Sequence, residues 1–138
     1  MIRDKLLLMS NEQAVTSSAA STDVIDTLAA GNAISPGARF RALTKVAATD
    51  VSSDATLTVE LQTSVDEAFT SPISLFSTGA LAFASFSPAK TVLADLVIPK
   101  GVKRYLRAYY TVASGPLTAG KFDAEIVLDS ATTLDKNL

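Results

Sequence analysis

The chain has 138 residues, 48% of them hydrophobic, and a formal net charge of −2. This length suits one domain with a single hydrophobic core, and a net negative charge argues against nucleic acid, which binds strongly cationic surfaces. The chain contains no cysteine and no histidine, which excludes disulfides, thiolate metal sites and nucleophile–histidine pairs.

The first 13 residues are expected to form an N-terminal arm that carries a short apolar patch, residues 6–9. This patch is too short for the apolar region of a secretory signal, which needs roughly 7–15 residues. No other stretch approaches the roughly 20 apolar residues of a membrane span. We therefore expect a soluble protein that is made in a cytoplasm and does not bind a membrane.

Residues 14–129 are expected to form the folded domain, because apolar and polar residues alternate there in short segments. The clearest segment is residues 57–62, where Leu57, Val59 and Leu61 alternate with polar residues. Strands are expected at residues 14–16, 23–28, 39–46, 57–62, 73–76, 91–98, 104–112 and 121–128. This pattern predicts an all-β antiparallel sandwich or jelly roll, followed by a polar tail over residues 130–138.

Two segments between these strands are less regular. Ser64 and Glu67 have the spacing of a capping box, which predicts a single helical turn before Pro72. The pattern over residues 80–90 assigns no conformation to that segment.

The nearest approach to a metal site is formed by Asp123, Glu125 and Asp129. The first two share one strand face, but calcium takes 6–8 oxygen ligands, so a solvated or lysine-paired face is the favoured interpretation. The six glycines form no Gly-x-Gly phosphate loop. We expect no metal, no cofactor and no enzymatic activity.

Basic residues are concentrated in residues 90–121, which hold six basic residues and one acid, against six and thirteen in the rest of the chain. Lys103, Arg104 and Arg107 adjoin two tyrosines, and arginine with tyrosine is typical of protein interfaces. A solvated hairpin and a stacking surface for nucleic acid are the alternatives. The three tyrosines Tyr105, Tyr109 and Tyr110 also permit sugar stacking.

Four blocks of the sequence, in order, resemble the Bbp16-like family of tailed-phage capsid cement proteins. The blocks are MIRDKLL, SNEQAVT and AASTDVID in residues 1–26, then LTVELQT with DEAF, then PKGVKRYLR, then YTV at residues 110–112. Together they span nearly the whole chain, whereas residues 80–90 do not follow the family pattern.

The resemblance implies a jelly-roll domain that forms a symmetric homo-oligomer on the outer surface of the virion. The sequence itself leaves a dimer and a trimer open, and we favour the dimer. It would bind the major capsid protein and join neighbouring subunits. A carbohydrate-binding jelly roll is the alternative. The residues expected at the capsid or oligomer interface are Arg3, Lys5, Leu6, Leu7, Leu8, Lys103, Arg104, Tyr105 and Arg107.

Overall fold

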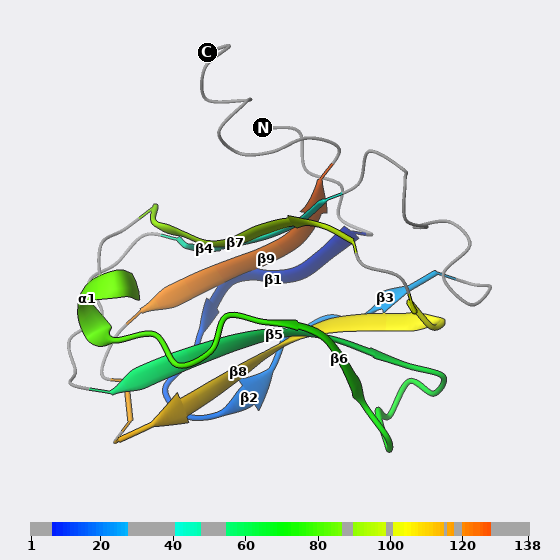
Figure 1. The fold of residues 1–138 in the computed structure, drawn as a ribbon, viewed down its shortest axis with the longest axis horizontal. Coiled ribbons are helices and arrows are strands. Elements are labelled where there is room, and N and C mark those ends of the chain that lie inside the picture. Colours follow the sequence, from blue (N-terminus) through cyan, green and yellow to red (C-terminus); the bar gives the residue numbers. More distant parts are fainter. Residues whose placement is uncertain are drawn as a thin grey trace, which may run out of the picture.

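Two antiparallel β-sheets pack face to face in the computed structural model (Figure 1). The structure describes residues 7–27, 41–47, 55–86, 90–98, 101–114, 116–117 and 120–127. The first sheet contains, in spatial order, β1 (Leu8–Ala14), β9 (Lys121–Val127), β4 (Arg41–Val46) and β7 (Val92–Val97). The second contains β2 (Ala19–Ala20) and β3 (Ile25–Asp26), both beside β8 (Tyr105–Ala113), then β5 (Thr56–Ser64) and β6 (Ile73–Ser77).

The connections between these strands are those of a jelly roll. The chain passes from one sheet to the other at almost every connection, and only β2 with β3 and the hairpin β5–β6 stay within a sheet. The short β2 and β3 pair with successive parts of β8 and together occupy one strand position. The predicted all-β jelly-roll sandwich is therefore confirmed.

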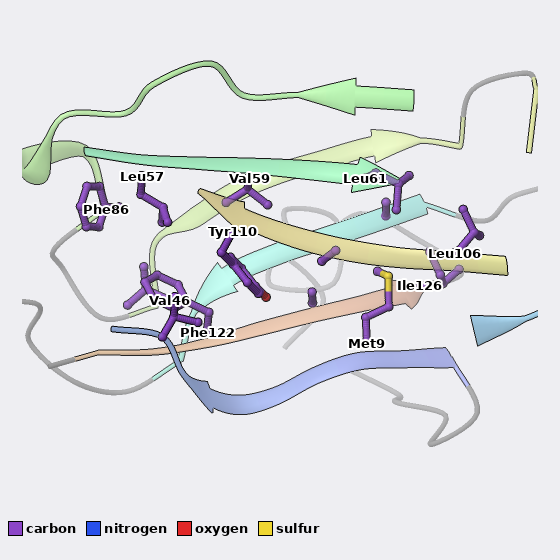
Figure 2. Packing of buried hydrophobic residues seen from close by; sticks show 14 of the residues in the cluster. Met9, Val46, Leu57, Val59, Leu61, Phe86, Leu106, Tyr110, Phe122 and Ile126 are labelled. Atoms are coloured by element: carbon purple, nitrogen blue, oxygen red, sulfur yellow. The ribbon is translucent and has the colours of Figure 1, made fainter. Parts of the chain in front are cut away.

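The pairing of β5 with β8 forms the centre of the second sheet. Nine residue pairs, from Thr56 with Ala113 to Ser64 with Tyr105, follow one another without a register shift. The inward side chains of both strands meet those of β4 and β9 in a single core (Figure 2). Leu57, Val59 and Leu61, predicted to share a buried face, are all at most 5% exposed.

The first strand departs from the predicted organisation. Residues 8–13, expected in an N-terminal arm, belong to β1 and pair with β9 in the sandwich. Met9 and Ser10 are at most 1% exposed. Two register shifts and a positive φ of 48° at Glu12 disturb the alternation that would reveal this strand in the sequence. Residues 1–6 and 130–138 lie outside the described part.

Residues 80–86, unassigned from the sequence, close one end of the core. The backbone of Leu81 forms two hydrogen bonds with Leu57, of 2.8 and 3.0 Å. The single helical turn α1 (Phe83–Phe86) follows, and its last residue, Phe86, is fully buried against the core. An apolar segment without regular alternation thus covers the sandwich without extending a sheet.

A buried polar network links the two sheets. Tyr110 of β8 donates a hydrogen bond of 2.9 Å to Ser10 Oγ of β1, and Ser10 donates one of 2.7 Å to Gln13 Oε1. The Gln13 amide in turn donates to the carbonyl of Ala20 in β2, at 3.0 Å. Burial raises the pKa of the Tyr110 phenol above its usual 10.0, so the hydroxyl remains a donor at neutral pH.

The Tyr110–Ser10 hydrogen bond should contribute measurably to stability. Ser10→Ala leaves the buried Tyr110 hydroxyl without its acceptor, and we expect it to lower the free energy of unfolding by about 1–3 kcal/mol. Tyr110→Phe should cost about 1 kcal/mol. The double variant should lose less than the sum of the two, as measured by urea denaturation, and additive losses would contradict the coupling.

Candidate interaction surface

The outer face of the second sheet carries the aromatic and basic residues of β8. Tyr105, Arg107 and Tyr109 lie on this face and are half-buried, whereas Leu106 and Ala108 point into the core. Strand β8 therefore has an apolar inner face and an aromatic–basic outer face. We call the face formed by Tyr105, Arg107, Tyr109 and their neighbours in β5 the β8 face.

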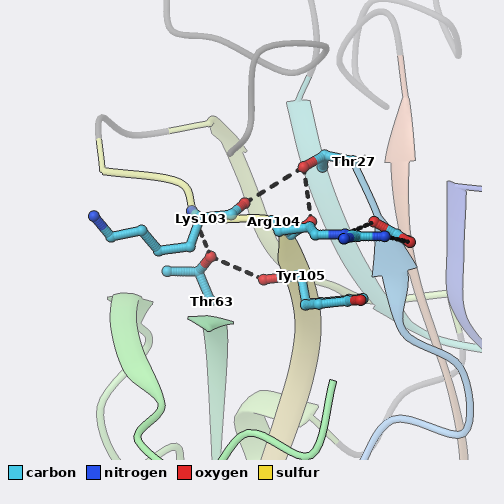
Figure 3. A network of polar contacts seen from close by, with 6 residues as sticks. Thr27, Thr63, Lys103, Arg104 and Tyr105 are labelled. Carbon is cyan, nitrogen blue, oxygen red and sulfur yellow. Dashed lines mark hydrogen bonds and ion pairs between the residues drawn. The ribbon is translucent and has the colours of Figure 1, made fainter. Parts of the chain in front are cut away.

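Two buried threonines fix the backbone where β8 begins (Figure 3). Thr63 Oγ accepts a hydrogen bond from the Lys103 amide and donates one to the Tyr105 carbonyl, both of 2.8 Å. On the other side, Thr27 Oγ donates to the Arg104 carbonyl at 2.7 Å. Neighbouring strands thus determine where the predicted interface residues emerge, while the side chain of Lys103 stays exposed.

Arg104 forms an ion pair within its own chain. Its Nε and Nη2 lie 2.9 and 3.1 Å from the two carboxylate oxygens of Asp26, and its guanidinium lies 5.1 Å from the centre of the Tyr105 ring. The hydrogen bond with Asp26 raises the pKa of Arg104. The pair is exposed, 45% for Arg104 and 37% for Asp26, so it stabilises the fold little.

Arg107 is held at the centre of the β8 face. Its guanidinium carbon lies 4.2 Å from the ring centre of Phe69 and 5.3 Å from that of Tyr109. Its Nε donates to Gln62 Oε1 at 2.9 Å, and the Gln62 amide donates to Glu60 Oε2 at the same distance. Gln62 and Arg107 are directly opposite in the β5–β8 register, which explains the contact.

Phe69 reaches Arg107 from the turn between β5 and β6. Its φ is 53°, an unfavourable value for an aromatic residue, and its side chain is 5% exposed. Asp66 stabilises this turn, because its carboxylate accepts hydrogen bonds from Ser64 Oγ and from the amide and hydroxyl of Thr70. The helical turn predicted from Ser64 and Glu67 is wrong, since Asp66 closes a non-helical turn instead.

The structure separates the other predicted interface residues from the β8 face. Leu7 and Leu8 are half-buried, and Leu8 lies in the first sheet opposite Glu125. Arg3, Lys5 and Leu6 lie outside the described residues. Tyr110, considered for sugar stacking, is fully buried in the core and cannot meet a sugar.

The carboxylates of β9 are buried, so the expectation of a solvated face is wrong. Asp123 is 5% and Glu125 is 1% exposed, and Asp123 Oδ1 accepts a hydrogen bond of 2.8 Å from the Glu12 amide. Among the described residues, no group of three or more carboxylates is arranged to hold a metal ion. Asp129, the third candidate ligand, lies outside them.

The described residues enclose a small cavity in the interior. A cavity of about 10 Å³ between the sheets, lined by Met9, Thr44 and Phe76 among others, has room for one water at most. None of the helices in the described ranges is long and apolar enough to cross a membrane.

The Asp66 turn predicts a specific pH dependence of stability. Hydrogen bonds from Ser64 and Thr70 lower the pKa of Asp66 below its usual 3.8. A depressed pKa stabilises the fold above the unfolded-state pKa, and this contribution is lost as the pH falls through the folded-state value. Between pH 7 and pH 2, the melting temperature of the wild type should therefore fall further than that of Asp66→Asn.

Glu67→Gln is the matched control for this prediction, because Glu67 is exposed in the same turn and hydrogen-bonds to no described residue. Its pH profile should run parallel to that of the wild type. A parallel profile for Asp66→Asn as well would show that the turn contributes nothing to acid sensitivity.

Comparison with known proteins identifies the family of this chain. No curated protein matches it significantly. A profile of the Bbp16 family, in contrast, matches residues 9–126, a span that begins in β1 and ends in β9 and so covers the whole sandwich. The chain therefore belongs to the Bbp16 family, a family of phage proteins.

Proposed function

We propose that this protein is a capsid decoration protein, which binds the outer surface of a tailed-phage head and stabilises contacts between major capsid protein subunits. The observation that carries the proposal is the family match over residues 9–126, together with the ordered blocks that resemble capsid cement proteins. In this role the protein is located on the virion and acts as a homo-oligomer, with a dimer favoured over a trimer. It needs no catalysis and no cofactor.

The β8 face supports this proposal physically. Half-buried Tyr105, Arg107 and Tyr109 give a contact surface rich in the residue types that dominate binding energy. Leu7, Leu8 and the residues before them are proposed as a second contact. A stable interface buries roughly 1,200–2,000 Å², and repetition over the shell turns modest pairwise affinity into lasting attachment.

The proposal also has a mechanical basis. A protein that bridges neighbouring shell subunits adds buried area between them and so opposes the internal pressure of packaged DNA. A jelly roll suits this role, because its two sheets share a continuous core and a buried polar link between Tyr110 and Ser10.

Binding to heads tests the proposal directly. Heads prepared without this protein should bind the purified chain at physiological salt in a co-sedimentation assay. Their melting temperature should rise once the protein is bound. Undetectable binding would end the proposal, and hits on a glycan array would then favour the carbohydrate-binding alternative.

Charge reversal on the β8 face should weaken attachment to these heads. We expect the double variant Arg104→Glu/Arg107→Glu to bind about tenfold more weakly or worse, because it replaces two cations at the proposed contact. The control Lys90→Glu/Lys121→Glu changes the net charge equally at exposed sites outside the second sheet and should bind like the wild type. Equal occupancy by both double variants would remove the β8 face from the interface.

A further inference from the structure

Arg107 differs from the other described arginines in lacking a carboxylate partner. Arg41 Nε lies 2.8 Å from Asp95 Oδ1, and Arg104 is paired with Asp26. Arg107 instead donates its Nε–H to the neutral amide oxygen of Gln62. Within the described part of the chain, no carboxylate lies within ion-pair distance of it and neither terminal nitrogen donates a hydrogen bond.

The position of this guanidinium is fixed before any partner arrives. Its guanidinium carbon lies over the rings of Phe69 and Tyr109, and its Nε donates a hydrogen bond to Gln62. Phe69 keeps a positive φ of 53° in a turn that Asp66 stabilises by three hydrogen bonds. Strained backbone that its surroundings maintain is concentrated at functional sites. The geometry therefore limits the entropy that Arg107 would lose on binding.

The surroundings of Arg107 also strengthen its attraction to an opposite charge on a partner. Arg107 is half-buried, and desolvation lowers the pKa of its guanidinium. A charge in such a position is attracted to an opposite charge more strongly than one in bulk water. Removing one member of a desolvated ion pair between proteins typically costs several kcal/mol.

We propose that Arg107 binds a carboxylate of an aspartate or glutamate on the partner protein, through its two terminal nitrogens. The planar guanidinium and the planar carboxylate match in a bidentate arrangement. This inference rests on the proposed function, which makes the partner the major capsid protein. Arg107, and not Lys103 or Arg104, is then the main contact with the major capsid protein.

The charges around Arg107 favour a protein carboxylate over a phosphate of nucleic acid. Glu60 lies one hydrogen-bonded step away through Gln62, and Asp26 neutralises Arg104 on the same face. These two acids would repel the successive phosphates of a polyanion. A single side-chain carboxylate, in contrast, can bind the guanidinium without approaching them. The net charge of −2 also disfavours binding to nucleic acid.

Three single variants, titrated onto heads that lack the protein, test this inference. Arg107→Gln should weaken binding by at least about 30-fold, because the partner carboxylate is left desolvated and unpaired. Arg107→Lys keeps the charge but loses the planar pair of donors, and it should weaken binding by about tenfold. The control Lys121→Gln removes an exposed cation of the first sheet, away from the β8 face, and should stay within about fivefold of the wild type.

Chemical cross-linking at position 107 identifies the group that Arg107 binds. A zero-length carbodiimide should join the lysine introduced by Arg107→Lys to an aspartate or glutamate of the major capsid protein, with the linked peptides identified by mass spectrometry. Thermal unfolding of each variant establishes that it is folded. A cross-link to a carboxylate supports the inference, and its absence from bound heads overturns it.

The remaining outcomes separate this inference from the proposed function. If the wild type binds heads and Arg107→Gln or Arg107→Lys binds equally well, the inference fails while the capsid proposal stands. If the wild type does not bind heads, both fail. If the wild type binds duplex DNA and Arg107→Gln abolishes that binding, the partner group is a phosphate and the inference is overturned.

Discussion

The uninterrupted pairing of β5 with β8 determines which of their side chains enter the core and which form the outer face of the second sheet. In this register Val59 and Tyr110 both face the core, and Gln62 lies directly opposite Arg107 on the outer face. A slip of one residue along either strand would turn that strand's side chains over, exposing apolar residues and burying polar ones. The core residues and the candidate surface residues therefore lie on opposite faces of the same two strands.

Alternating apolar and polar residues predict most of the strands that the structure contains. Residues 57–61 of β5 and 105–110 of β8 alternate between the core and the outer face, so the sequence pattern predicts their inward residues. Strand β1 could not be predicted in this way, because its register shifts and the positive φ at Glu12 interrupt the alternation. In β9, both faces are buried, so Asp123 and Glu125 were wrongly expected in a solvated environment, which a local pattern cannot distinguish from a covered one.

The candidate surface was predictable only in part, and for a related reason. The succession Tyr105, Arg107 and Tyr109 shows in the sequence that these residues share one face. The ion pair of Arg104 with Asp26 depends on pairing between β3 and β8, which are about eighty residues apart in sequence, and no local signal indicates it. The approach of Phe69 to Arg107 depends on an unfavourable φ, which the sequence does not disclose either. Of the two arginines in the predicted basic cluster, Arg104 is paired with Asp26, whereas Arg107 has no carboxylate partner among the described residues.

A density map of the mature phage head at side-chain resolution would show whether the β8 face contacts the major capsid protein. We expect this jelly roll on the outer surface of the shell, with the β8 face against a major capsid protein subunit and a carboxylate of that subunit at Arg107. A shell without this protein, or one in which the β8 face is turned to solvent, would contradict this expectation.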